Sequence, residues 1–312
     1  WFALANDRGN STPGFVMMTV LMLREHNRIA GLLEQEYGAA GGWDDERIFQ
    51  TTRNILTVLV LKIVVEEYIN HITPYHFKLF VDPARMFRPQ KWKWTNWMTV
   101  EFNLLYRWHS MIPNELRLGE QTISSYDALW NPNLLVSNGL APMFNYASRQ
   151  PAGRIGAKNT WEHLVEMAEV PTVQMAREAE VASYNDYRAL CKMPRVTAFD
   201  QITSDPAILD ALKTLYANPD EIEFYPGLFA EELRPDSALA PLVGTLVGID
   251  AFSQALTNPL LHPRTYCAET FSPLGWRIIH EPQTIEGLVR RNTPEHTGEY
   301  RISMTREGWT HS

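Results

Sequence analysis

Apolar residues at helical spacing dominate the first half of the chain and constrain its fold more than any other feature. Thr12 can cap a helix that begins at Pro13, and apolar residues then recur every three or four positions up to a glycine-rich break at 38–42. Asp44 can cap a second helix, which we expect to end before Pro74. Two long neighbouring helices with apolar faces predict a helical core.

The rest of the chain has helical patterns as well. A third helix is expected from about Thr95 to Ile112, before Pro113, and shorter helices over 160–175, 207–217 and 284–291. No strand alternation persists beyond a few residues, and there is no internal repeat. We therefore expect a mainly α fold, arranged as a single domain over residues 1–312.

The composition excludes several classes of protein. Of the 312 residues, 45% are hydrophobic and 21% charged, so the chain can bury a sizeable core and is not disordered. A net charge of −8 argues against nucleic-acid binding, because phosphate contacts need a surplus of basic residues. The two cysteines, Cys191 and Cys267, cannot build a disulfide framework. We expect a bacterial or intracellular source and a cytoplasmic or peripheral-membrane location.

Neither a membrane-spanning helix nor a signal peptide is evident. The longest apolar stretch, Ile55 to Val65, has eleven residues and is broken by Lys62, whereas a spanning helix needs about 20. The chain opens at Trp1 without an initiator methionine or a helix cap. We therefore expect it to be an N-terminally incomplete piece of a longer protein.

Common catalytic motifs are missing from the sequence. It has no glycine-rich phosphate loop, no Gly-x-Ser-x-Gly elbow and no His-Glu-x-x-His zinc helix. Nine histidines remain as candidates for chemistry. His26 lies in a charged helical run, where a hydrogen-bonded structural network is the expected role.

His109 is different, because its neighbours place it on an apolar helix face. Met98, Phe102, Leu105, His109 and Ile112 are spaced 4, 3, 4 and 3 residues apart. A buried imidazole needs a partner, which can be a metal, a haem iron or, more commonly, a hydrogen bond. Tyr106 lies one turn earlier on nearly the same face, as electron transfer from a tyrosine to an oxidised iron would require.

Six sequence segments carry a family resemblance. The runs LREHNR at 23–28 and WDDERIFQ at 43–50 resemble the animal-type haem peroxidase superfamily. The runs YHFKL at 75–79, EFNLLYRWH at 101–109, EFYPGL at 223–228, and RPD at 234–236 followed by AFS at 251–253 are similar to those of the cyclooxygenases and related fatty-acid dioxygenases. The resemblance extends from about Pro13 to Arg291 and implies the helical haem peroxidase fold with haem b (iron protoporphyrin IX) as cofactor.

The resemblance also implies roles for individual residues. His109 matches the proximal haem ligand, and Tyr106 matches the tyrosine whose radical takes a hydrogen from the bis-allylic carbon of a polyunsaturated fatty acid. Tyr225 matches a tyrosine that hydrogen-bonds near the proximal histidine, and Tyr75 a residue at the mouth of the fatty-acid channel. The positions that match the channel lining are Tyr68, Ile69, Thr73, Phe102, Leu105 and Ser253.

The sequence departs from the cyclooxygenase pattern at several points. Arg107 replaces a histidine, as in fungal fatty-acid dioxygenases, and Gln254 follows Ser253 where an aliphatic residue is usual. The distal histidine, the distal glutamine, the channel arginine and the membrane-binding helices of the family would all lie upstream of Trp1. Arg8 falls close to the distal arginine of the peroxidase branch, where it would supply a cation over the haem; a surface role is the alternative.

Three functions are open at this point. The first is a haem-dependent fatty-acid oxygenase with peroxidase activity, which acts on a polyunsaturated fatty acid with dioxygen or peroxide. The second is a plain haem peroxidase that reduces hydroperoxides. The third is a non-catalytic haem- or lipid-binding relative. The resemblance also implies a possible homodimer, since family members are often homodimers.

Overall fold

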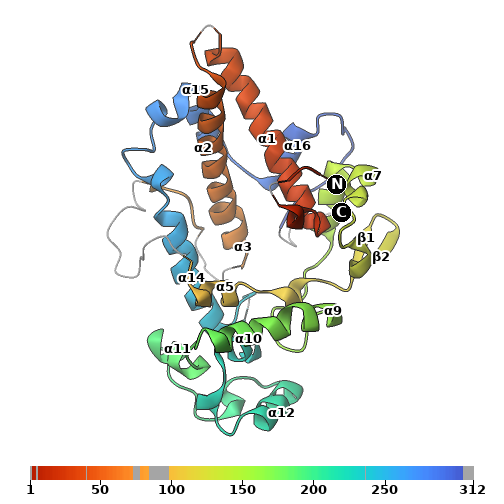
Figure 1. Cartoon of the computed structure of the whole chain (residues 1–312), viewed down its shortest axis with the longest axis vertical. Helices are drawn as coiled ribbons and strands as arrows, with labels where there is room; N and C mark the ends of the chain where they lie inside the picture. Colours follow the sequence, from red (N-terminus) through yellow and green to blue (C-terminus); the bar gives the residue numbers. More distant parts are fainter. Residues whose placement is uncertain are drawn as a thin grey trace.

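A helical hairpin forms the upper part of the molecule (Figure 1). The computed structural model describes residues 2–4, 6–39, 41–72, 78–83, 98–235 and 237–304. The hairpin consists of α1 (Pro13–Tyr37) and α2 (Asp45–Ile63). The Thr12 hydroxyl accepts from the Phe15 N–H, and the Asp44 carboxylate accepts from the Arg47 N–H, so both expected helix starts are confirmed.

The second helix runs further without a break. It continues from α2 through the π-helix η2 (Val64–Ile69) into α3 (Asn70–Ile72). The resulting 28-residue helix, Asp45–Ile72, is long and apolar enough to cross a membrane, so the expectation that the chain has no such helix is wrong. Core helices of soluble proteins pass the same test, and this one buries Ile55 and Leu59 completely. Length and composition therefore assign it no membrane role.

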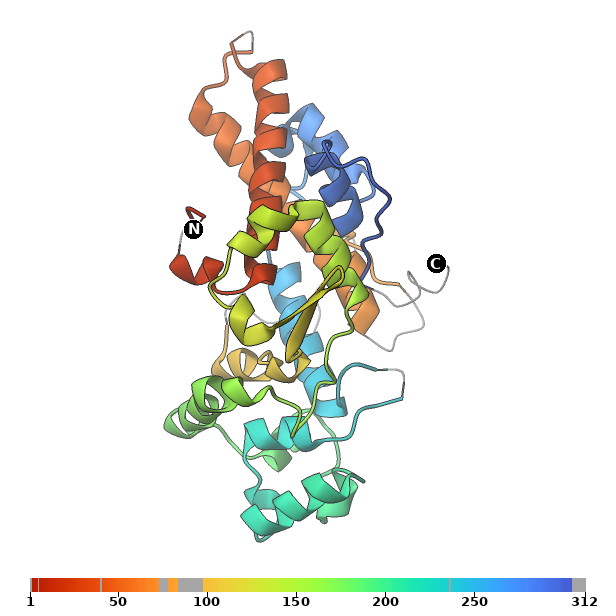
Figure 2. The ribbon, with the colours of Figure 1, turned by 90° about the vertical axis from the view of Figure 1, so that its right-hand side faces the viewer.

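Three apolar clusters hold the molecule together. One lies between α1, α2 and α15 (Ala268–His280), and a second between the start of α1, α8 (Leu140–Arg149) and α16 (Ile285–Asn292). The largest cluster occupies the lower part of the molecule, seen from a second side in Figure 2. Its helices are α5 (Val100–Leu105), α10 (Val170–Glu178), α11 (Tyr184–Leu190), α12 (Pro206–Leu215), α13 (Phe224–Ala230) and α14 (Pro241–Leu256).

Short elements complete the fold. The hairpin of β1 (Glu115–Leu118) and β2 (Gln121–Ser124) turns at Gly119, whose φ of +66° favours glycine. The other elements are η1 (Asp7–Asn10), η3 (His109–Met111), α6 (Ser125–Ala128), α7 (Asn133–Asn138), α9 (Glu162–Leu164), η4 (Val165–Glu169), η5 (Phe199–Gln201), η6 (Pro219–Glu221) and η7 (Pro259–Leu261). The fold is mainly α, and the three short helices expected from the sequence are present as α9–η4–α10, α12 and α16.

The structural network expected at His26 centres on its neighbour. Glu25 is fully buried on α1, and its carboxylate accepts hydrogen bonds from Arg28, Arg291 and Asn292. The His26 ring packs on Phe49, and its Nε2 atom is buried without a hydrogen-bond partner in the described part of the chain. The network is therefore present, but the prediction that His26 belongs to it is wrong.

Candidate active site

The segment from Tyr106 to His109 leaves the helix in which it was expected. Helix α5 ends at Leu105, and His109 opens the short 3₁₀ turn η3. The Leu105 carbonyl, which would accept the His109 N–H in a continuing helix, accepts the Trp108 indole N–H at 2.7 Å instead. The Arg107 N–H already donates to the Leu104 carbonyl and the Trp108 N–H to the Tyr106 carbonyl, so the helical hydrogen-bond pattern has ended before His109.

The shared apolar face predicted from Met98 to Ile112 is consequently wrong. Met98 is 60% exposed and Ile112 is 40% exposed, while Leu105 is fully buried. Residues 95–97 of the expected helix lie outside the described residues. His109 occupies a different environment from the apolar face because the chain has turned before it reaches this residue.

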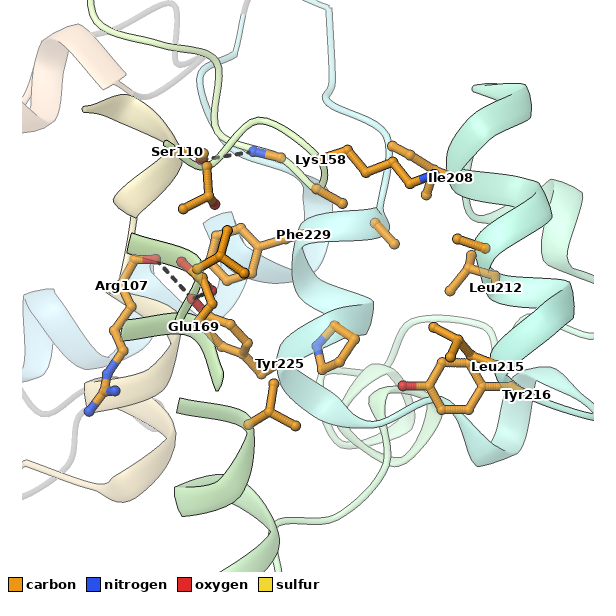
Figure 3. Close-up of a pocket in the computed structure, with 18 residues that line it drawn as sticks. Arg107, Ser110, Lys158, Glu169, Ile208, Leu212, Leu215, Tyr216, Tyr225 and Phe229 are labelled. Carbon is orange, nitrogen blue, oxygen red and sulfur yellow. Dashed lines mark hydrogen bonds between the residues drawn. The ribbon is translucent and has the colours of Figure 1, made fainter. Parts of the chain in front are cut away.

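His109 pairs with a carboxylate that the sequence reading did not identify. Its Nδ1 atom lies 2.7 Å from Oε1 of Glu169, and the Tyr225 hydroxyl donates to Oε2 of the same carboxylate at 2.8 Å. The Tyr225 hydroxyl also lies 3.3 Å from the Arg107 carbonyl (Figure 3). The structure therefore brings the predicted residues His109 and Tyr225 together through Glu169.

The electrostatics of this cluster favour an ionised carboxylate. Burial alone would raise the pKa of Glu169, but hydrogen bonds from His109, Tyr225 and Thr160 lower it overall. Burial, and the neighbouring Glu169 carboxylate, raise the pKa of Tyr225, which stays a protonated donor. Both oxygens of Glu169 are therefore held by donors in a partly buried site.

The position of Glu169 depends on a local irregularity of its helix. Glu169 ends the π-helix η4, in which the Val170 N–H donates to the Val165 carbonyl five residues earlier. Pro171 follows two residues after Glu169; it has no N–H, and its ring would clash with the carbonyl four residues before it in a regular helix. Pro171 inside an expected helix was a sequence signal for an irregular turn. Nothing in the sequence indicated a partner sixty residues away.

Tyr106 lies in an apolar and aromatic environment. Its ring stacks on Trp108 with centroids 4.6 Å apart and packs on Phe102 at 5.1 Å. The Tyr68 hydroxyl, from η2, donates a hydrogen bond to the Tyr106 hydroxyl. Burial raises the pKa of both phenols, so both are protonated at neutral pH.

The other predicted site residues fall into four groups. Ile69 and Leu105 are buried in the same apolar cluster as Tyr106, and Tyr68 and Phe102 pack against it. Ser253 is buried on α14, which contacts α5. Arg8 is exposed on η1, and no described contact joins it to the His109 segment. The last two residues, Thr73 and Tyr75, lie outside the described residues.

A cavity of about 400 Å³ opens on the Glu169 side of the cluster (Figure 3). Its walls are mostly apolar side chains of α12 and α13, including Ile208, Leu212 and Phe229. A polar cleft of about 420 Å³ adjoins it and shares Ser110, Lys158 and Thr160. The cavity therefore lies behind the carboxylate, on the Nδ1 side of His109.

The residues fit a haem iron better than a bare metal ion. Within the described ranges, no group of three His, Cys, Asp or Glu side chains could hold a metal ion. A haem iron needs one protein ligand on this side, and His109 can provide it. Its Nδ1 is engaged by Glu169, while no described residue hydrogen-bonds its Nε2. A histidine ligand commonly donates its second N–H to a carboxylate in this way.

Known proteins are similar to this sequence over most of its length. The family model for animal haem peroxidase matches residues 1–297. The chain is 34% identical to prostaglandin G/H synthase 1 of Mus musculus over 282 residues, 90% of this chain and 46% of that relative. It is 33% identical to prostaglandin G/H synthase 2 of Equus caballus over 293 residues, 93% of this chain and 48% of that relative. The chain thus spans about half the length of these curated relatives.

Solved structures share the fold. Fatty acid alpha-dioxygenase from Oryza sativa superposes with a TM-score of 0.80 at 16% identity, covering 97% of this chain and 59% of that one. Peroxidase A from Dictyostelium discoideum gives 0.75 at 20% identity, covering 98% of this chain and 60% of that one. The chain therefore belongs to the animal haem peroxidase family, in the cyclooxygenase-like branch that its motifs resemble.

Proposed function

We propose that this chain carries the radical step of a haem-dependent fatty-acid oxygenase. The substrates would be a polyunsaturated fatty acid and dioxygen, with a peroxide as activator. The observation that supports this most is the environment of Tyr106, a partly buried, protonated phenol that is hydrogen-bonded to Tyr68 and stacked on Trp108. Tyr106 stands three residues from the histidine that fits the proximal ligand.

Each residue has a role in this proposal. His109 would hold the haem iron through Nε2, and the haem, when bound, supplies the one-electron oxidising power that a peroxide generates. Tyr106 loses its phenolic hydrogen and becomes a radical, which takes a hydrogen atom from the bis-allylic carbon of the fatty acid and is thereby restored. Dioxygen then adds to the carbon radical, and the resulting peroxyl radical takes a hydrogen atom from Tyr106, which gives the fatty-acid hydroperoxide and regenerates the tyrosyl radical. Tyr68 donates to the Tyr106 oxygen and orients it with or without its own hydrogen.

The apolar residues around Tyr106 support the substrate class. Ile69, Leu105 and Phe102 lie in or against one cluster with Tyr106, and an acyl chain gains about 0.8 kcal/mol per methylene that leaves water. The names of the relatives agree with this class, since they include a fatty acid alpha-dioxygenase. The apolar setting also limits reaction of the carbon radical with water.

Oxygen uptake tests the proposal. Haem-reconstituted chain is given linoleate or arachidonate with a trace of hydroperoxide, beside Tyr106→Phe and the control Tyr126→Phe, which changes an exposed tyrosine. We expect uptake in the wild type and in the control, and background uptake in Tyr106→Phe with peroxidase turnover intact. Peroxidase turnover without oxygen uptake in the wild type would favour a plain haem peroxidase. Activity in neither the uptake assay nor the peroxidase assay would contradict a catalytic role for this chain.

A further inference from the structure

We infer that Glu169 is a positioning residue for the haem ligand: it fixes the orientation and tautomer of His109 and increases the electron density that its Nε2 atom donates to iron. This inference rests on the proposed function, because it needs a haem iron bound at His109. It assigns a role to a residue that the sequence motifs of the family did not identify.

The hydrogen-bond chemistry determines the tautomer. An ionised carboxylate only accepts hydrogen bonds, so the hydrogen between Nδ1 of His109 and Oε1 of Glu169, 2.7 Å apart, belongs to the histidine. In a neutral imidazole the other nitrogen, Nε2, then carries the lone pair that binds iron. The side chains of His109 and Glu169 are only 23% and 20% exposed, which strengthens this hydrogen bond relative to one in water.

Two further contacts prevent the carboxylate from turning away. The Tyr225 hydroxyl donates to Oε2 at 2.8 Å, so the second oxygen is fixed from α13. Arg107, two residues before His109, donates to the Thr172 hydroxyl at 2.6 Å, and Thr172 is fully buried three residues after Glu169. The segment that carries the histidine and the helix that carries the carboxylate are therefore tied at two points. The arginine that replaces the usual histidine makes the second of these ties.

A charged hydrogen-bond acceptor behind a ligating histidine has a known electronic consequence. It makes the imidazole a stronger donor to the metal and favours the higher oxidation states of the iron, so the reduction potential falls. A purely structural ion pair would hold the two segments together without this effect. The potential and the iron–histidine bond therefore separate the two roles.

The experiment compares haem-reconstituted wild type with Glu169→Gln and with Glu166→Gln. Glu166 lies on the same π-helix but is exposed, so its variant makes the same chemical change away from the histidine. The readouts are the Fe(III)/Fe(II) potential and the iron–histidine stretching frequency of the ferrous protein. We expect Glu169→Gln to raise the potential and lower the frequency at unchanged haem stoichiometry, and Glu166→Gln to change neither.

Tyr225→Phe should shift the potential and the stretching frequency in the direction opposite to Glu169→Gln. Removing this donor leaves more negative charge on Glu169 for the His109 hydrogen bond, so the potential should fall and the frequency should rise. Unchanged values in both Glu169→Gln and Tyr225→Phe would overturn the inference. If Glu169→Gln does not fold, the direction of the Tyr225→Phe shift alone supports or contradicts it.

Failure of the inference can be told apart from failure of the proposed function. A wild type without an iron–histidine band contradicts haem binding at His109, and the inference falls with it. If the wild type has this band and takes up oxygen, and the potential and frequency are unchanged in Glu169→Gln and Tyr225→Phe, only the inference is contradicted.

Discussion

Tyr106 and His109 are three residues apart, yet they lie in opposite kinds of environment. Tyr106 is surrounded by aromatic and aliphatic side chains, and its one described hydrogen bond comes from the neutral phenol of Tyr68. His109 is bonded to an ionised carboxylate that three donors stabilise. The difference shows that one short non-helical segment places the phenol of the proposed radical in an apolar cluster and the imidazole of the proposed haem ligand in a polar one.

A second carboxyl makes the contrast clearer. Asp250 lies on α14, which packs on α5, and is 7% exposed. Burial and the negative charge of Glu101 raise its pKa to about 6, whereas the pKa of Glu169 is lowered. The ionised form of Asp250 is therefore penalised, while that of Glu169 is stabilised by its hydrogen-bond donors.

Replacing His109 should have the largest effect, because it removes the polar half of the comparison between Tyr106 and His109. His109→Ala removes the nitrogen proposed to bind the iron, so haem titration should no longer give a saturating Soret band. Tyr106→Phe should retain full haem binding because its side chain contributes packing and a radical, not a ligand. His296→Ala, at an exposed histidine, is the control. A Soret band in His109→Ala equal to that of the wild type would contradict the assignment of the ligand.

Neutralising the two carboxyls should change stability in opposite directions. Asp250→Asn should raise the free energy of unfolding at pH 7.5 by about 2 kcal/mol, because it removes a charge whose pKa is raised by roughly two units. Glu169→Gln should lower it by about 1–2 kcal/mol, because it weakens charge-assisted hydrogen bonds. Urea unfolding of the haem-free variants measures both. Destabilisation by both changes would show that the environments do not differ in the way described.

The pH dependence of stability should also differ between Glu169, which bonds His109, and Tyr68, which lies beside Tyr106. The pKa of Glu169 is lower in the folded chain, so its contribution is present above the unfolded value of about 4.3 and is lost as the pH falls through the folded pKa. The pKa of Tyr68 is raised, so its folded form keeps a proton that the unfolded chain loses above about pH 10, and stability falls there. We therefore expect Glu169→Gln to flatten the acid limb and Tyr68→Phe the alkaline limb of the unfolding free energy. If each variant shifts the profile uniformly with pH, these two groups do not control the limbs.

Loss of the Tyr68 hydroxyl should have the smallest effect at neutral pH. Tyr68→Phe removes one hydrogen bond between neutral phenols, which contributes about 1 kcal/mol. Oxygen uptake should fall by a few-fold at most and haem binding should not change, because Tyr106 remains in place. Loss of uptake as complete as in Tyr106→Phe would mean that Tyr68 takes part in the radical step itself.

Much of the fold could be predicted from the sequence, because helix starts and apolar spacing are local features. The caps at Thr12 and Asp44, the short helices α12 and α16, and the mainly α fold all follow from residues within a few positions of each other. The sequence predicts the third helix but not its end. The helix stops at Leu105, where the Trp108 indole N–H donates to the Leu105 carbonyl and the Tyr225 hydroxyl from α13 donates to the Arg107 carbonyl, and helical spacing predicts neither contact.

The sequence by itself determined the helical class, the family motifs and the candidates His109, Tyr106 and Tyr225, since these depend on residue type and order. Only the tertiary structure decided that Glu169 binds His109, that Arg107 ties their two segments together, and that Asp250 is a penalised charge. These properties arise from side chains that are dozens of residues apart and share one low-dielectric space. Their distances and solvation therefore exist only once the helices have packed.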